Sequence, residues 1–96
     1  MKEIISISNR AKELYRKALE KWDEPSQMMM VIEECSELQK EICKAFRGKG
    51  KRENLVDEVT DVLIMIEQVI CMFDLQDEVV TRKEEKLNRL EQRIGE

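Results

Sequence analysis

Four carboxylates in this sequence have the type and spacing that could hold a divalent cation. Glu34 and Glu37 are three residues apart, and so are Glu58 and Asp61. On a helix, residues three apart have Cβ atoms about 5–6 Å from each other, so each pair can converge on one ion. Acid pairs from facing helices are a common way for helical bundles to hold divalent metals. Because the sequence contains no histidine, we expect an all-oxygen site, which suits Mg²⁺ and also Mn²⁺.

The position of these acids on their helices supports a metal site. The first acid pair lies on a helix with an apolar stripe at spacings of three and four, formed by Met28, Val31, Cys35, Leu38, Ile42 and Phe46. On a helical wheel Glu34 lies at the edge of this stripe, with Glu37 and Glu41 beside it. Glu58 and Asp61 continue along their helix into an apolar row formed by Met65, Val69 and Met72. Burying carboxylates there without a cation or strong donors would be unfavourable. The alternative is a solvated acidic face, because acid pairs also arise by chance in a chain with 40% charged residues.

Two strong breaks and one weaker break divide the chain into the helices that must position these acids. The first break, 23–26, contains the single proline, and the second, 47–52, contains two glycines. The third break, at 73–76, is weaker. The predicted helices cover roughly 4–22, 26–46, 53–73 and 75–94. Residues 53–73 are apolar around most of the helix, which indicates a central position, and the short connections indicate antiparallel neighbours.

These features predict an all-α protein with a single domain over residues 1–96. We expect a compact, antiparallel, four-helix bundle-like fold. A chain of 96 residues buries only a modest fraction of its surface. Oligomerisation is therefore expected as a source of stability.

Composition excludes several classes of partner and location. The net charge of −4 disfavours sequence-independent nucleic-acid binding. The longest apolar run, 62–66, is far shorter than the roughly 18–20 residues of a membrane helix. The N-terminal residues do not form an apolar signal segment, and the odd number of cysteines favours reduced thiols. We therefore expect no nucleic-acid partner, no membrane association and a cytoplasmic location.

The acidic motifs resemble those of a known enzyme superfamily. The segment Glu33-Glu34-Cys35-Ser36-Glu37-Leu38 precedes a basic loop and then Asp57-Glu58-Val59-Thr60-Asp61-Val62-Leu63. This order resembles the EExxE, spacer and ExxD pattern of the MazG-like all-α nucleoside triphosphate pyrophosphohydrolases. The similarity covers roughly residues 22–94, and its specific part lies within 27–66. Gln27 and Leu38 also resemble the family pattern.

The resemblance implies a reaction and a set of roles. Glu34, Glu37, Glu58 and Asp61 would be the Mg²⁺ ligands, and the role of Glu33 stays open. The enzyme would hydrolyse a nucleoside triphosphate between the α and β phosphates, giving a monophosphate and pyrophosphate. Glu34 and Glu37 are the candidate catalytic residues. Glu37 is the first candidate for the base that accepts a proton from the attacking water, with Glu41 or metal-bound hydroxide as alternatives.

Candidate substrate contacts come from several separate parts of the chain. Lys83 and Lys86 could meet the outer phosphates, as could the basic loop 47–52. Trp22 could stack on the base and Gln27 could hydrogen-bond to it. Three of these features also have a purely structural interpretation. Lys83 could extend along the bundle edge to solvent, the loop 47–52 could be a solvated turn, and Trp22 could be an anchor in the core or an interface.

The sequence departs from the family at the turn that follows the second motif. Many members carry a polar residue there, whereas this chain has Ile64 and Met65. The departure leaves the substrate open.

Two other functions remain alternatives. Phosphoribosyl-ATP pyrophosphohydrolase belongs to the same superfamily and would use the same acids. A non-enzymatic helical interaction protein would use residues 53–73 as an oligomer seam and its acids as a solvated face. The family resemblance and the wide apolar face of 53–73 favour a homotetramer built from dimers, or a homodimer, in which a neighbouring subunit completes the nucleotide pocket.

Overall fold

The computed structural model describes residues 6–96, and every regular element among them is a helix. Helix α1 spans Asn9–Phe46, α2 spans Arg52–Met72 and α3 spans Gln76–Ile94. The all-α prediction is therefore confirmed. No helix within residues 6–96 is both long and apolar enough to cross a membrane.

The first two predicted helices are joined as one kinked helix. Asp23, with φ 67° and ψ 169°, interrupts the helical backbone inside α1. Its carboxylate Oδ1 accepts a hydrogen bond from the Ser26 amide at 3.0 Å, so Asp23 caps the second half of α1. Pro25 lies in the first turn after that cap, where its missing N–H is not needed. The predicted break is thus a sharp kink without a loop.

The start of α1 differs from the prediction. Residues 6–8 precede the helix, and the Ser8 hydroxyl caps it by accepting from the Ala11 amide at 3.1 Å. The helix was predicted to start at residue 4. Residues 4 and 5 lie outside the described residues.

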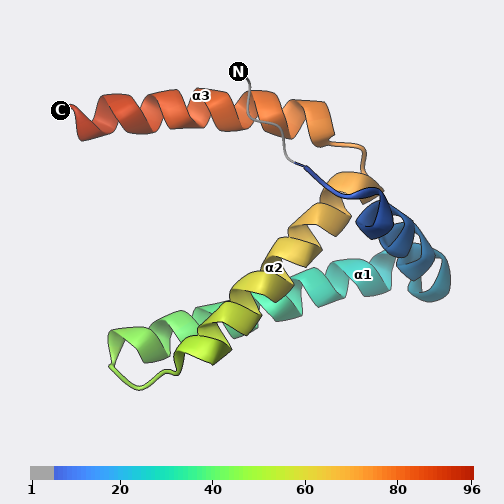
Figure 1. The fold of residues 1–96 in the computed structure, drawn as a ribbon, viewed down its shortest axis with the longest axis horizontal. Helices are drawn as coiled ribbons and strands as arrows, with labels where there is room; N and C mark the ends of the chain where they lie inside the picture. Colours follow the sequence, from blue (N-terminus) through green and yellow to red (C-terminus); the bar gives the residue numbers. More distant parts are fainter. Residues whose placement is uncertain (1–5) are drawn as a thin grey trace.

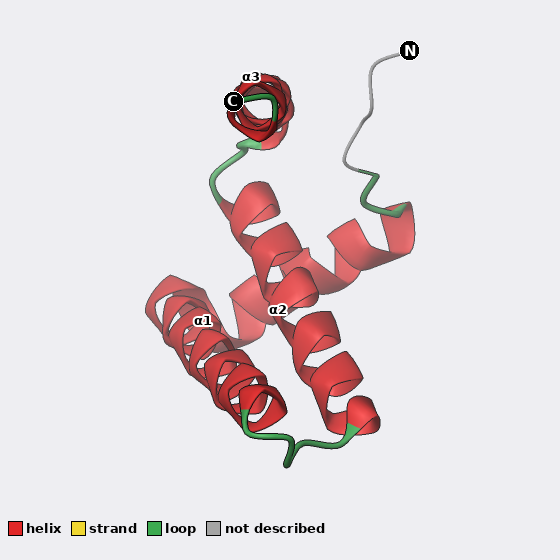
Figure 2. Ribbon diagram, turned by 90° about the vertical axis from the view of Figure 1, so that its left-hand side faces the viewer, coloured by secondary structure: helices red, strands yellow, loops and turns green. Residues whose placement is uncertain are grey.

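The second half of α1 and the helix α2 form an antiparallel hairpin closed by the basic loop (Figure 1). In Figure 2 the two helices lie side by side above the loop. The first half of α1, residues 9–22, bends back at the kink toward the end of α2. There the Tyr15 hydroxyl donates to the Glu67 carboxylate at 2.6 Å. This contact fixes the first half of α1, which we call the N-terminal arm, against α2.

A compact four-helix bundle is not formed within one chain. Helix α3 runs apart from the α1–α2 hairpin in both views, and none of the residues within Gln76–Ile94 is buried. The radius of gyration is 15.9 Å, against about 12–13 Å for a compact chain of this length. The outer side of α2 also remains exposed, so its predicted central position is not reached in a single chain. One chain does not supply enough helices to cover both sides of α2.

The buried side of α1 is more polar than the apolar stripe predicted for it. Gln27 and Glu41 are 2% and 9% exposed, whereas Phe46 in the stripe is 89% exposed. Gln27, Glu34 and Glu41 are seven residues apart and therefore share one side of the helix. Helix α2 packs along that side, so a polar seam lies between α1 and α2.

Candidate metal centre

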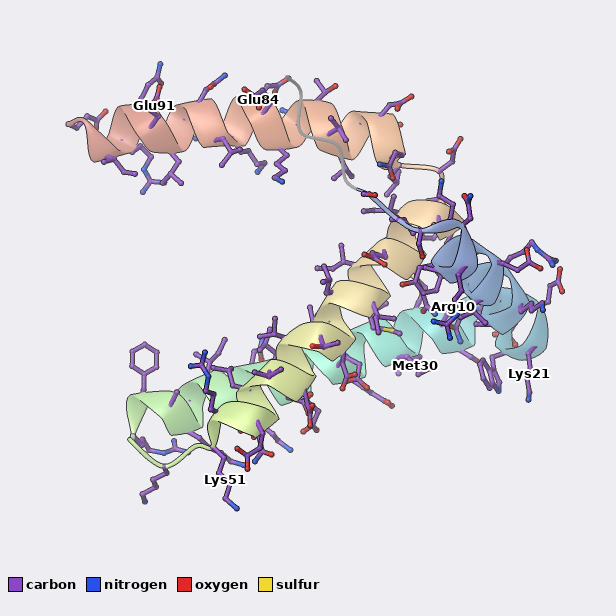
Figure 3. All side chains as sticks on the ribbon, viewed as in Figure 1. Arg10, Lys21, Met30, Lys51, Glu84 and Glu91 are labelled. Carbon is purple, nitrogen blue, oxygen red and sulfur yellow. The ribbon has the colours of Figure 1, made fainter. Side chains whose placement is uncertain are left out.

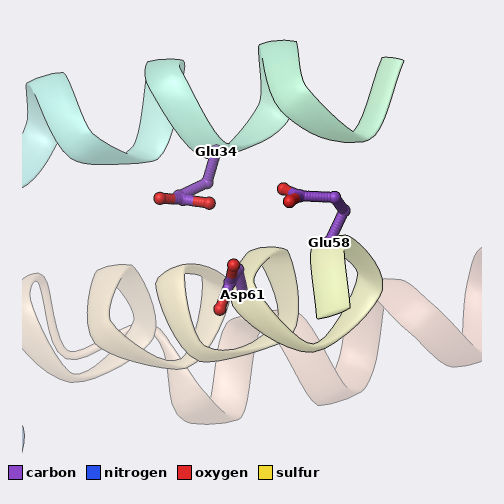
Figure 4. A group of neighbouring side chains, drawn as sticks. All are labelled: Glu34, Glu58 and Asp61. Carbon is purple, nitrogen blue, oxygen red and sulfur yellow. The ribbon is translucent and has the colours of Figure 1, made fainter. Parts of the chain in front are cut away.

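Three acidic side chains converge across this seam. Carboxylate oxygens of Glu34 from α1 and of Glu58 and Asp61 from α2 all lie within 4.8 Å of one another (Figure 4). Glu58 and Asp61 share one side of α2 because they are three residues apart. Glu34 lies opposite them because the hairpin aligns the two helices in antiparallel order. All three side chains are half-buried.

Proximity and burial change the ionisation of the group. Burial raises the pKa of Glu34, and the negative charges of Asp61 and Glu58 raise it further. Burial likewise raises the pKa of Glu58, followed by the charges of Asp61 and Glu37. Each raised pKa means that the ionised form is disfavoured in the folded chain. A divalent cation would relieve both the desolvation and the mutual repulsion.

Two carboxylate oxygens in the seam have no hydrogen-bond partner within the described part of the chain. They are Glu58 Oε2 and Glu41 Oε1, and both are buried. The other oxygen of Glu41 contacts Lys44 Nζ at 3.1 Å. Buried oxygens without partners are uncommon in proteins and indicate a missing ligand or water. A set of carboxylate oxygens fits the hard cations Mg²⁺ and Mn²⁺.

Glu37 lies at the margin of this cluster. Its carboxylate is not among the three that converge; it is exposed, and Oε1 lies 3.5 Å from Lys40 Nζ. Its charge is nevertheless close enough to raise the pKa of both Glu34 and Glu58. Its role as a metal ligand or base stays a prediction. The exposed position leaves the carboxylate accessible to water.

Glu41 is more central to the seam than its position outside the two acidic motifs indicated. It is the most buried carboxylate in the described chain, and one of its oxygens is unpartnered. Its spacing of seven from Glu34 was the available signal, because residues seven apart share a helix side. The apolar stripe beside it concealed this signal, because the stripe indicated an apolar interface without carboxylates.

The predicted substrate residues are dispersed in a single chain. Trp22 is exposed beside the kink, with Lys21 Nζ 5.1 Å from its ring centroid, whereas Gln27 is buried. Lys83 and Lys86 belong to α3, which lies apart from the acids. Figure 3 shows Lys51 at the loop end of the hairpin, far from the kink. The structure therefore unites three predicted metal ligands and leaves the basic residues elsewhere.

Comparison with known proteins identified no relative. The chain matches no protein-family model, no curated protein and no solved structure. Its function therefore has to be inferred from its motifs and from the chemistry of the acidic seam.

Metal-free protein should lose thermal stability as the pH rises from 4.5 into the neutral range. The pKa values of Glu34 and Glu58 are raised above their usual 4.5, so the folded state binds more protons than the unfolded state in this range. Stability then decreases as the pH rises through the raised values. The groups facing them are Glu37, Glu41, Asp57, Asp61 and the cation Lys44.

Melting temperatures measured in a chelator at several pH values would check this. The decrease should be smaller in Glu58→Gln, and Mg²⁺ should counteract it by competing with protons for the carboxylates. The lowered pKa of Glu13, caused by Arg16, acts in the opposite direction but only below 4.5. A melting temperature that increases steadily from pH 4.5 to neutrality would contradict the expectation.

Proposed function

We propose that this chain is a Mg²⁺-dependent nucleoside triphosphate pyrophosphohydrolase that cleaves between the α and β phosphates. The observation that carries the proposal is the convergence of Glu34, Glu58 and Asp61 from two helices. Buried oxygens without partners and raised pKa values support it, because both indicate a site made for a cation. The matching acidic motifs supply the reaction class. Cytoplasmic nucleotide-pool house-cleaning is the role we expect.

The proposed mechanism assigns distinct tasks to the acids. Glu34, Glu58 and Asp61 would hold the ion, with Glu37 as a further predicted ligand at the margin. When bound, Mg²⁺ would neutralise the phosphates and stabilise charge on the leaving pyrophosphate. Without it, the acidic seam would repel a triphosphate.

The hydrolytic step needs a base and an accessible water. A water oxygen would form a bond to the α-phosphorus while the bond from that phosphorus to the α–β bridging oxygen breaks. Pyrophosphate would leave with the electron pair, and the exposed carboxylate of Glu37 would accept the proton of the water. Glu37 suits this task because it borders the cluster and contacts solvent.

We further propose that the active form is a homodimer or a homotetramer built from dimers. The outer side of α2 carries an exposed apolar row with spacings of three and four, formed by Val56, Val59, Leu63 and Ile66. Such spacing suits packing against another helix. Helix α3 has its own exposed apolar residues, Leu87, Leu90 and Ile94. Because α3 lies apart from its own hairpin, it could reach a neighbouring copy and bring Lys83 and Lys86 to the phosphates there.

Product analysis with a panel of ribo- and deoxynucleoside triphosphates tests the reaction. We expect monophosphate and pyrophosphate in the presence of Mg²⁺ or Mn²⁺, and no products in a chelator. Release of inorganic phosphate instead of pyrophosphate would contradict the proposed bond. No turnover of triphosphates, but turnover of phosphoribosyl-ATP, would favour the related enzyme.

A further inference from the structure

A second site lies about two helical turns from the acids. A pocket of ≈ 400 Å³ opens where the N-terminal arm meets the C-terminal half of α2 and the start of α3. Its volume falls in the range of small-ligand sites, about 300–1,000 Å³. The lining residues that matter here are Tyr15, Leu19, Gln27, Gln68 and Met72.

The buried carboxamide of Gln27 and the half-buried one of Gln68 form the neutral polar part of this pocket. Gln27 is 2% exposed, and its Nε2 donates to the weak acceptor Met30 Sδ at 3.8 Å. Gln68 Oε1 is buried and has no hydrogen-bond partner within the described residues. Leaving the Gln68 oxygen unsatisfied is unfavourable, and a thioether sulfur is a weak acceptor for the Gln27 amide. Together the two groups indicate a ligand with a complementary polar edge.

The remaining lining favours an uncharged, flat ligand over an anion. Leu19 and Met72 supply apolar surface, and Tyr15 supplies an aromatic ring. Three charged residues, Lys12, Arg16 and Asp74, also line the pocket, but all three are exposed. The Arg16 guanidinium is in addition paired with Glu13 at 2.6 Å and with Glu20. The interior therefore combines apolar surface with neutral donors and acceptors, which is the chemistry that a nucleobase requires.

The pocket glutamines and the acids are offset by the same number of residues on α1 and on α2. Gln27 precedes Glu34 by seven residues, and Gln68 follows Asp61 by seven. Each separation is two turns, or about 10 Å along the helix axis. A ribose and its first phosphates could bridge this distance.

We propose that this pocket binds the nucleobase of the substrate, with Gln27 and Gln68 hydrogen-bonded to its polar edge. The proposal rests on the proposed function and adds Gln68, Tyr15 and the N-terminal arm to the nucleotide site. Each carboxamide offers one acceptor and two donors, and the Watson–Crick edge of every nucleobase presents a donor beside an acceptor. Gln68 is then a specificity-determining residue for the base, whereas the acids act on the phosphates.

Nucleosides carry no phosphate, so their binding tests the pocket independently of the acidic cluster. With ¹³C-methyl-methionine labelling, titration with uridine, cytidine, adenosine and guanosine in a chelator should shift the Met72 methyl resonance. Gln68→Leu should abolish that shift and raise KM for the preferred triphosphate by about 10-fold or more, since it removes the hydrogen bonds and keeps the bulk. The matched control is Gln39→Leu, an exposed glutamine on α1, and circular dichroism checks the helix content of both variants.

The outcomes separate this proposal from the proposed function. No Met72 shift with any nucleoside, or unchanged KM and base ranking in Gln68→Leu, would overturn the base pocket while turnover stands. A Met72 shift that Gln68→Leu abolishes would support the base pocket even if no triphosphate were hydrolysed. Mg²⁺ binding, measured separately, should be retained in Gln68→Leu and lost in Glu58→Gln.

Discussion

Replacing Glu58 by glutamine should reduce kcat/KM for the preferred triphosphate by more than about 100-fold. Even indirect partners of metal ligands contribute about 10- to 100-fold, and Glu58 would be a direct ligand. The fold should persist, because the change removes a carboxylate that is repelled by Asp61 and Glu37. The metal-free variant should therefore melt at or above the temperature of the unmodified protein at neutral pH.

Turnover, Mg²⁺ titration and thermal melting of the same preparations would check this result. Glu91→Gln is the matched control, since Glu91 is an exposed acid on α3, far from the seam (Figure 3). Unchanged turnover in Glu58→Gln would refute the metal centre, whereas neither turnover nor Mg²⁺ binding in the unmodified protein would favour a helical interaction protein. A strongly lowered melting temperature would instead assign Glu58 a structural role.

Replacing Leu63 by glutamate should dissociate the assembly. Leu63 is 54% exposed in the single chain, where a polar substitution would change the stability only slightly. In a dimer that packs through the outer side of α2, the same glutamate would be buried without a partner. Sedimentation should then give a species near 11.4 kDa, and activity should decrease because the basic residues of α3 no longer reach a neighbouring site.

Gln39→Glu is the control for this substitution. It places the same charge at an exposed position of the hairpin, on α1 and away from the apolar row of α2. The unmodified protein should show a melting temperature that increases with protein concentration, as expected for an obligate oligomer. A monomer of unmodified sequence at micromolar concentration, with full activity, would exclude the oligomer.

Much of the fold could be predicted from local signals. Pro25 and the two glycines of the basic loop identified the breaks, because proline and glycine act through the backbone of their own residues. The kink was predicted as a loop, since nothing local indicated that Asp23 would adopt a left-handed φ. The packing was less predictable. Apolar periodicity shows which side of a helix avoids water, but does not show whether its own chain or another chain covers it.

The candidate site was also predicted in part, where its residues are close in sequence. The pairs at spacing three placed Glu58 and Asp61 together, and Glu34 joined them across the hairpin. Glu41 was given only a minor role and Gln68 none, because their importance depends on burial, which arises only when α1 and α2 pack. The polar seam was also concealed by the apolar stripe of α1, whose middle residues are only half-buried and whose ends, Met28, Ile42 and Phe46, are exposed.

The separate position of α3 has a consequence for the lifetime of the chain. A helix without buried residues opens locally at little free-energy cost. Helix α3 also carries several lysines and arginines, which are cleavage sites for trypsin-like proteases. In a copy outside an assembly, a trypsin-like protease should cut this helix as well as the exposed basic loop 47–52. The rate of cleavage within α3 in limited proteolysis would therefore report the fraction of unassembled chains.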